Sequence, residues 1–150
     1  MEPVDMTNFK DGFGDCFRAC LASICELSIE SIPNYWEKTQ DAHEYWKMMN
    51  IWSRENLGAA LITLDVATGH EYLLEDVLCI AIGTTGRSNE DHAVVWKNGL
   101  LHDPHPSRRG INSTPSCFTF IVPLTDNRPC GKGARGSDER NHRAISQRAK

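Results

Sequence analysis

One cysteine stands where a nucleophile could form. Cys16 follows Gly14 and Asp15 and opens a segment with helical periodicity. A thiol in the first turn of a helix lies at the positive end of the helix dipole, which stabilises the thiolate. The unpaired N–H groups of that turn can also receive an oxyanion. We therefore predict that Cys16 is a nucleophile; the alternative is burial as a small core residue, which we expect for Cys20, Cys25, Cys79 and Cys117.

A histidine and an aspartate lie on the two strands of a predicted hairpin. Asn98-Gly99 favours a two-residue turn, and the resulting register pairs Val95 with His102. Because side chains alternate along a strand, His92 and Asp103 then share a face as diagonal neighbours, about 7–8 Å apart. Asp103 would orient the imidazole of His92, which would act as the base for a thiolate. His102 is expected to point to the opposite face.

The same histidines and aspartate allow other interpretations. His102, Asp103 and His105 could bind a metal, since imidazole and carboxylate are ligands for zinc or iron. Strand alternation separates His102 from the other two residues and argues against that site. Each residue could also be structural, because Asp103-Pro104 is a common turn sequence. The preferred interpretation requires no cofactor and no metal.

The elements that must position these residues are helices first and strands afterwards. Apolar residues recur at helical spacing over residues 16–27, with Asp15 as the expected N-cap. Residues 34–50 predict a second helix. Strands are expected at residues 59–66, at 77–82 as a central strand buried on both faces, at 92–97 and 100–103 in the hairpin, and at 118–124. This order predicts an α+β domain with N-terminal helices packed on an antiparallel sheet.

Loops beside the hairpin are expected to shape a cleft. Residues 83–91 and 104–116 flank the two predicted strands, and binding residues concentrate on such connections. Trp36, Trp46 and Trp52 are expected to pack between helices rather than to hold a substrate.

Charge divides the chain into two parts. The 150 residues, 40% of them hydrophobic and 24% charged, fit one globular domain. Residues 1–125 contain 9 Lys and Arg against 17 Asp and Glu, whereas residues 126–150 contain 7 against 3. We predict an acidic folded domain over 1–125 and a basic flexible tail over 126–150. The net charge of −4 argues against a nucleic-acid partner, and the tail is a candidate contact for an acidic one.

The beginning of the chain and the cysteine spacing predict a compartment. The acidic start lacks the basic and apolar regions of a signal peptide. No apolar run approaches the roughly 18 residues that span a bilayer, so no membrane contact is expected. We predict a cytoplasmic protein whose six cysteines are thiols, and the lack of a CxxC pair argues against a zinc ribbon.

Three segments resemble the papain-like cysteine hydrolase superfamily. They are Gly14-Asp15-Cys16-Phe17-Arg18-Ala19-Cys20-Leu21-Ala22-Ser23, His92-Ala93-Val94-Val95 and His102-Asp103-Pro104-His105-Pro106. They are similar to bacteriocin-leader peptidase domains of peptide-exporting transporters, and to small uncharacterised papain-like proteins of bacteria and their phages. The resemblance extends in order over residues 5–124.

The resemblance implies a papain-like fold and roles for named residues. Cys16 would be the nucleophile, His92 the general base and acid, and Asp103 the orienting residue. Enzymes of this superfamily usually carry a glutamine shortly before the cysteine, which completes the oxyanion hole. Gln40 and Gln147 are the only glutamines here, and neither precedes Cys16. Asn8 is the nearest upstream amide and becomes the candidate oxyanion donor.

These observations predict a cysteine hydrolase that cleaves an amide or isopeptide bond of a peptide or protein through a thioester. The alternative is a catalytically weak or inactive papain-fold binding protein, such as a phage or bacterial regulator of a host protein. The missing glutamine favours this alternative, and the retained Cys-His-Asp set argues against it.

Overall fold

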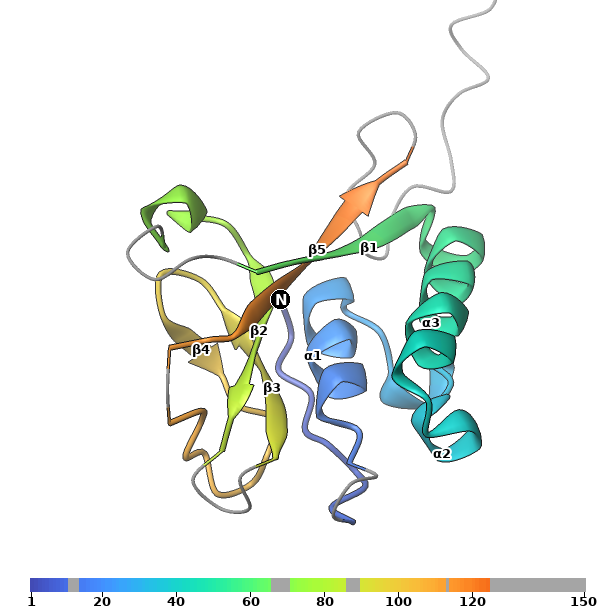
Figure 1. Cartoon of the computed structure of the whole chain (residues 1–150), viewed down its shortest axis with the longest axis horizontal. Helices are drawn as coiled ribbons and strands as arrows, with labels where there is room; N and C mark the ends of the chain where they lie inside the picture. The colour runs from blue at the N-terminus through green and yellow to red at the C-terminus, as the bar shows by residue number, and fades with distance from the viewer. Residues whose placement is uncertain (11–13, 66–70, 86–89, 113, 125–150) are drawn as a thin grey trace, which may run out of the picture.

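The structure is a computed structural model that describes residues 1–10, 14–65, 71–85, 90–112 and 114–124. It confirms an α+β protein, with helices followed by a five-stranded antiparallel sheet (Figure 1). The helices are α1 (Cys16–Cys25), η1 (Ile29–Ser31), α2 (Trp36–Thr39), α3 (Ala42–Leu57) and η2 (Glu71–Leu74). The strands are β1 (Ala59–Leu64), β2 (Cys79–Thr84), β3 (Asp91–Trp96), β4 (Leu100–His102) and β5 (Cys117–Pro123). Over the described ranges, no helix has both the length and the apolar character to cross a bilayer.

The second helical region differs from the prediction, because residues 34–50 do not form one helix. The chain leaves helical geometry at Gln40, whose φ is 52°, and separates α2 from α3. Asp41 then begins α3 by accepting a hydrogen bond from the N–H of Glu44 at 2.8 Å. The apolar pattern runs through this break, so periodicity alone did not reveal it. Gly58 ends α3 with a φ of 62°.

β2 is the central strand, as predicted. The sheet order is β1-β5-β2-β3-β4. Ile80 packs on the helix side of the sheet and Ala81 on the opposite side, and both are fully buried. The strand lies two residues further along the chain than expected. Gly83 and Thr84 therefore belong to β2, and Asp91 begins β3, which corrects the prediction of a loop over 83–91.

The hairpin between β3 and β4 has a different turn from the predicted one. Trp96 pairs with Leu100, so three residues form the turn. A register shift between Val95 and Trp96 then leaves Leu101 as an extra residue on β4, as in a β-bulge. Beyond it, Val95 pairs with His102. The predicted register is wrong at the turn and correct at the end that carries Asp103.

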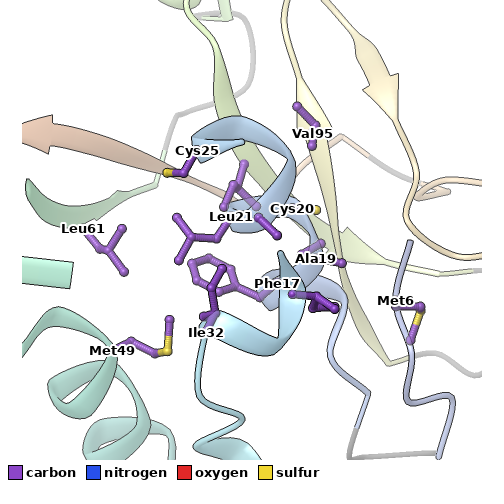
Figure 2. Close-up of a cluster of buried hydrophobic side chains, with 14 of the residues drawn as sticks. Met6, Phe17, Ala19, Cys20, Leu21, Cys25, Ile32, Met49, Leu61 and Val95 are labelled. Atoms are coloured by element: carbon purple, nitrogen blue, oxygen red, sulfur yellow. The ribbon is translucent and has the colours of Figure 1, made fainter. Parts of the chain in front are cut away.

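The main core lies between α1, α3 and the sheet. Figure 1 shows α1 between the sheet and α3, and Figure 2 shows Phe17, Leu21, Ile32 and Met49 in the space around α1. A smaller cluster of Cys79, Ala81, Val94 and Phe118 covers the other face of the sheet. Packing on both sides holds α1 firmly against β3, because close-packed interiors resist displacement. The first residue of α1 is thereby fixed relative to the first residues of β3.

The cysteines fall into more than one class. Cys20, Cys25 and Cys79 are fully buried, as expected for core residues. Cys117 differs from the prediction, because it is half-buried and lines a cleft. Cys16, Cys20, Cys79 and Cys117 are free thiols. Cys25 is disulfide-bonded, so the prediction of a thiol is wrong for that residue. The predicted tail, with Cys130, falls outside the described residues.

Candidate active site

Cys16 is the first residue of α1 and lies against the beginning of β3. Its sulfur accepts a hydrogen bond from the backbone N–H of Ala93 at 3.4 Å. The side chain is half-buried and lines a cleft of about 700 Å³. The thiol is therefore held in place from the sheet and still open to a ligand.

His92 connects Cys16 to Asp103. Its Nε2 lies 2.8 Å from Oδ1 of Asp103, and both side chains are buried. The His92 ring also forms a side-chain hydrogen bond with Cys16. Because Nε2 is engaged with the carboxylate, Nδ1 is the nitrogen that faces the thiol. The structure thus brings together the cysteine, histidine and aspartate that the sequence singled out.

Electrostatics favour a charged imidazole at this position. Burial lowers the pKa of His92, but the hydrogen bonds to Asp103 and to Cys16 outweigh it and raise this pKa to about 9. Burial acts in the opposite sense on Asp103, yet the bonds from His92, Gly110 and His105 hold the pKa of its carboxyl well below the usual range. At neutral pH the pair is therefore an imidazolium and a carboxylate. A positive charge therefore lies beside Cys16.

Asp103 is fixed by the loop that follows β4. Its Oδ1 accepts the N–H of His105 at 2.8 Å, and its Oδ2 accepts the N–H of Gly110 at 2.7 Å. Gly110 has a φ of 66°, in the left-handed region that favours glycine. Arg108 donates to the carbonyl of Asp103 and pairs with Asp5 at 2.7 Å. The carboxylate cannot rotate away from His92 without breaking several of these bonds.

His102 contacts the N-terminal segment, so it does not join Asp103 and His105 in the metal site considered above. Its Nε2 lies 3.1 Å from the carbonyl oxygen of Val4 and 3.6 Å from Asp5. Asp103 is engaged with His92 on the other side. Within the described ranges, no group of three or more His, Cys, Asp or Glu residues is arranged to hold a metal ion.

Asp15 occupies the N-cap position of α1, but its side chain does not cap the helix, contrary to the prediction. The carboxylate is buried and turns toward the N-terminal segment. It accepts the N–H of Thr7 and of Asn8, each at 3.0 Å, and the hydroxyl of Thr7 at 2.8 Å. Arg18 adds an ion pair at 3.2 Å. Asp15 thus holds residues 7–8 against the first turn of α1.

The structure does not bring the amide of Asn8 to Cys16, so the predicted oxyanion role is not supported. Nδ2 of Asn8 donates to Oε1 of Glu37 in α2 at 2.7 Å, and Asn8 does not line the cleft. The residue is engaged in joining the N-terminal segment to α2. The donors that remain at Cys16 are backbone N–H groups in the first turn of α1, which have no partner within the helix.

The cleft extends from Cys16 along α2 and α3 on one side and the sheet on the other. Its lining residues include Phe17, Trp36, Tyr45, Trp46, Thr63, Glu90, Asp91, His105, Ser116 and Cys117. Both predicted cleft segments contribute, since Asp91 ends the first and Ser116 the second. Trp52 is a core residue, as expected. Trp36 and Trp46 differ from the prediction, because they face the cleft as well as their neighbouring helices.

Sequence reasoning did not place two rings in the cleft that Cys16 lines: Tyr45, and His105, which it considered as a possible metal ligand. Tyr45 lines the same cleft as Cys16, and burial, followed by the charge of Cys16, raises the pKa of its phenol. His105 stands edge-on to His92 with ring centres 6.3 Å apart, and both rings line the cleft. Tyr45 belonged to a helical apolar pattern and His105 to a turn, so neither carried a local indication of its position.

No protein-family model, curated protein or solved structure matches this chain.

Proposed function

We propose that the protein is a papain-like cysteine hydrolase that cleaves an amide or isopeptide bond. The observation that carries the proposal is the contact series from Cys16 through His92 to Asp103, at the wall of a cleft large enough for a peptide segment. A nucleophile, a base and a residue that orients the base are the parts that acyl transfer requires. Three separate elements supply them, so local sequence proximity does not explain the arrangement.

The reaction would proceed in two stages. The Cys16 thiolate attacks the carbonyl carbon and forms a tetrahedral oxyanion. Collapse of this intermediate breaks the C–N bond, while the imidazolium of His92 gives its proton to the leaving amine. A water molecule then loses a proton to His92 and attacks the thioester, which releases the acid and restores the thiolate-imidazolium pair. Asp103 keeps the ring oriented and stabilises its positive charge in both stages.

The oxyanion would lie against the first turn of α1. The N–H of Cys16 is directed along the helix axis toward the residues that precede the helix, as every first-turn N–H is. The carboxylate of Asp15 is turned away to the N-terminal segment. Backbone donors of this kind stabilise the developing charge, and in other hydrolases one such donor contributes about 10²–10³-fold to the rate.

The proposal is tested by the reactivity of Cys16. Iodoacetamide at pH 6 should alkylate Cys16 faster than Cys117, which lines the same cleft, and much faster than buried Cys79, as followed by peptide mass mapping. His92→Ala should slow the labelling of Cys16 by about tenfold or more, because the charge that stabilises the thiolate is lost. Equal labelling of Cys16 and Cys117, or labelling that is insensitive to His92→Ala, would contradict a cysteine hydrolase.

A second candidate is a papain-like binding protein with little or no turnover. The engagement of Asn8 with Glu37 favours it, because the cleft then lacks the upstream amide that such enzymes use. A single-turnover experiment with an activated ester, which acylates Cys16 and forms a thioester, distinguishes the hydrolase from the binding protein. A hydrolase releases the acyl group from Cys16, whereas a binding protein of this type stays acylated or does not react.

A further inference from the structure

The N-terminal segment joins the two sides of the candidate site. It lies between α1 and the end of the β3–β4 hairpin (Figure 1). On the helix side it donates hydrogen bonds to Asp15, which directly precedes Cys16. On the hairpin side the N–H of Met6 donates to the carbonyl oxygen of Pro104 at 3.0 Å, and Pro104 directly follows Asp103. One segment therefore contacts the chain neighbours of both Cys16 and Asp103.

An ion pair between Asp5 and Arg108, which we call the clamp, completes this connection. Nη1 and Nη2 of Arg108 contact the two carboxylate oxygens of Asp5 at 2.7 Å and 2.8 Å. The same guanidinium donates through Nη1 to the carbonyl oxygen of Asp103. Two parallel bonds to one carboxylate fix the orientation of a guanidinium. The clamp therefore ties the backbone of Asp103 to the N-terminal segment.

Arg108 holds an unfavourable backbone conformation. Its φ is 52°, in the left-handed region that side chains with a Cβ disfavour. This conformation turns the loop back toward β4, and the N–H of Gly110 reaches Oδ2 of Asp103 at 2.7 Å. A conformation of this kind persists only where surrounding contacts hold it, and such residues concentrate at functional sites. The side-chain contacts that hold Arg108 are those to Asp5 and to Asp103.

The clamp lies outside the cleft. Neither Asp5 nor Arg108 lines the cleft, and both side chains are about half-exposed. The two residues therefore do not touch a substrate bound there. Salt screens an exposed pair of this kind, and such pairs contribute little to the stability of a whole fold. An effect of the clamp on Cys16 would thus act through Asp103 rather than through unfolding.

We infer that Asp5 and Arg108 are positioning residues for the candidate triad, because together they hold Asp103 where its carboxylate orients His92. This inference rests on the proposed function, since it concerns the residue that orients the base. Asp5 also lies 3.6 Å from His102, which gives it a second route to the end of β4. A test must therefore separate the route through Arg108 from the route through His102.

The first measurement is the rate at which iodoacetamide alkylates Cys16 at pH 6 in dilute buffer. Asp5→Asn should lower this rate by about threefold, because a less firmly held Asp103 stabilises the imidazolium of His92 less. Arg108→Gln should lower the rate at least as much, since the bond to the carbonyl of Asp103 is lost as well. In the Arg108→Gln background Asp5→Asn should have no further effect, because Asp5 acts through Arg108.

Two matched variants control for the loss of a charge alone. Glu2→Gln removes an exposed carboxylate from the same segment, and Arg109→Gln removes an exposed guanidinium next to Arg108. Cys16 should react at the parent rate in both. In the parent, about 0.5 M KCl should slow the labelling by a factor similar to that of Asp5→Asn, whereas the rate in Asp5→Asn should respond little to salt.

The second measurement follows the hydrogen bond between His92 and Asp103 directly. The imidazolium proton on Nε2, which is donated to Oδ1 of Asp103, gives a downfield NMR signal that His92→Ala removes and so assigns. In Asp5→Asn this signal should move upfield and exchange faster with water, while in Glu2→Gln it should not change. A loss of folding stability alone would not move the signal, and thermal unfolding checks that each variant keeps its fold.

The outcomes separate this inference from the function on which it rests. If labelling of Cys16 depends on His92 but Asp5→Asn leaves the rate or the NMR signal unchanged, the inference is overturned and the hydrolase proposal stands. If Asp5→Asn is equally effective in the Arg108→Gln background, Asp5 acts through His102 and the clamp is overturned as well. If labelling of Cys16 does not depend on His92, the proposed function itself fails, and the NMR signal still decides whether the clamp acts on the hydrogen bond of His92.

Discussion

Helices α1 and α3 both begin directly after an aspartate, yet the two aspartates make different contacts. Asp41 is exposed and accepts the N–H of Glu44 at 2.8 Å, which is an N-cap made within four residues of chain. Asp15 is buried and accepts its hydrogen bonds from Thr7, Asn8 and Arg18. The start of α3 is satisfied locally, whereas the start of α1 is held by tertiary contacts.

The difference shows how a helix start can be kept available for chemistry. A capping carboxylate occupies the N–H groups of the first turn and places a negative charge beside them. At α1 the carboxylate of Asp15 points away, so these groups are not covered where Cys16 faces His92. The same residue type before a helix therefore stabilises the helix in one place and secures a candidate site in the other.

The largest expected effect concerns Asp103, which orients His92 beside Cys16 at the start of α1. Asp103→Asn should lower the rate of Cys16 acylation on the order of 10²–10³-fold, because an amide orients the imidazole without stabilising its charge. The bond to Asp103 raises the pKa of His92, which is about 9 in the parent, so the variant should have a lower value. His92 then loses the proton for the leaving amine at lower pH, and the alkaline limit of activity should move toward neutral pH.

A pH profile of labelling and turnover for parent and variant checks this result. Thermal unfolding provides the control for folding, since Asp103 also accepts the N–H groups of His105 and Gly110. If the alkaline limit of activity is the same in Asp103→Asn as in the parent, Asp103 does not control the pKa of His92 and this prediction is wrong.

The second effect compares the two aspartates directly. Asp15→Ala should lower the free energy of unfolding by about 3 kcal/mol, because the half-buried Arg18 and three other donors lose a buried acceptor. Asp41→Ala should lower it by only about 1 kcal/mol, the usual contribution of an N-cap. Asp15→Asn keeps one acceptor oxygen and should fall between them. Urea unfolding of the three variants measures these free energies. If Asp15→Ala and Asp41→Ala lose the same free energy of unfolding, the two helix starts are stabilised to the same extent and the comparison is wrong.

The third effect asks whether a helix start alone activates a thiol. Ala42 is the first residue of α3 and is exposed, so Ala42→Cys in a Cys16→Ala background places a thiol at the other helix start. Cys16 in the parent should react with iodoacetamide at pH 6 about tenfold faster than this introduced thiol, because Cys16 has the imidazolium of His92 hydrogen-bonded to it. His92→Ala should slow Cys16 and leave the introduced thiol unchanged. If Cys16 in the parent and the introduced thiol in the variant react at similar rates, the helix dipole alone accounts for the reactivity of Cys16.

Local patterns predicted more of the fold than of the site. The beginning of α1 and the central strand β2 follow from apolar periodicity, which acts over a few residues. The pairing of Val95 with His102 was predicted from a two-residue turn, and it is correct because the extra residue Leu101 offsets the three-residue turn. The break at Gln40 was not predicted, because the apolar pattern continues through it. The bulge at Leu101 was not predicted either, because it depends on how β4 pairs rather than on its composition.

For the candidate site, the sequence determined which residue types stand at a helix start and at two adjacent strands: Cys16, His92 and Asp103. The diagonal placement of His92 and Asp103 follows from the strand register. The contact of His92 with Cys16 depends on how α1 packs against the beginning of β3. Tertiary structure alone decided what surrounds them. The engagement of Asn8 with Glu37, the burial of the Asp15 carboxylate and the position of Tyr45 in the cleft that Cys16 lines join segments far apart in the chain. Such contacts depend on the packing of whole elements, which no local pattern of residues specifies.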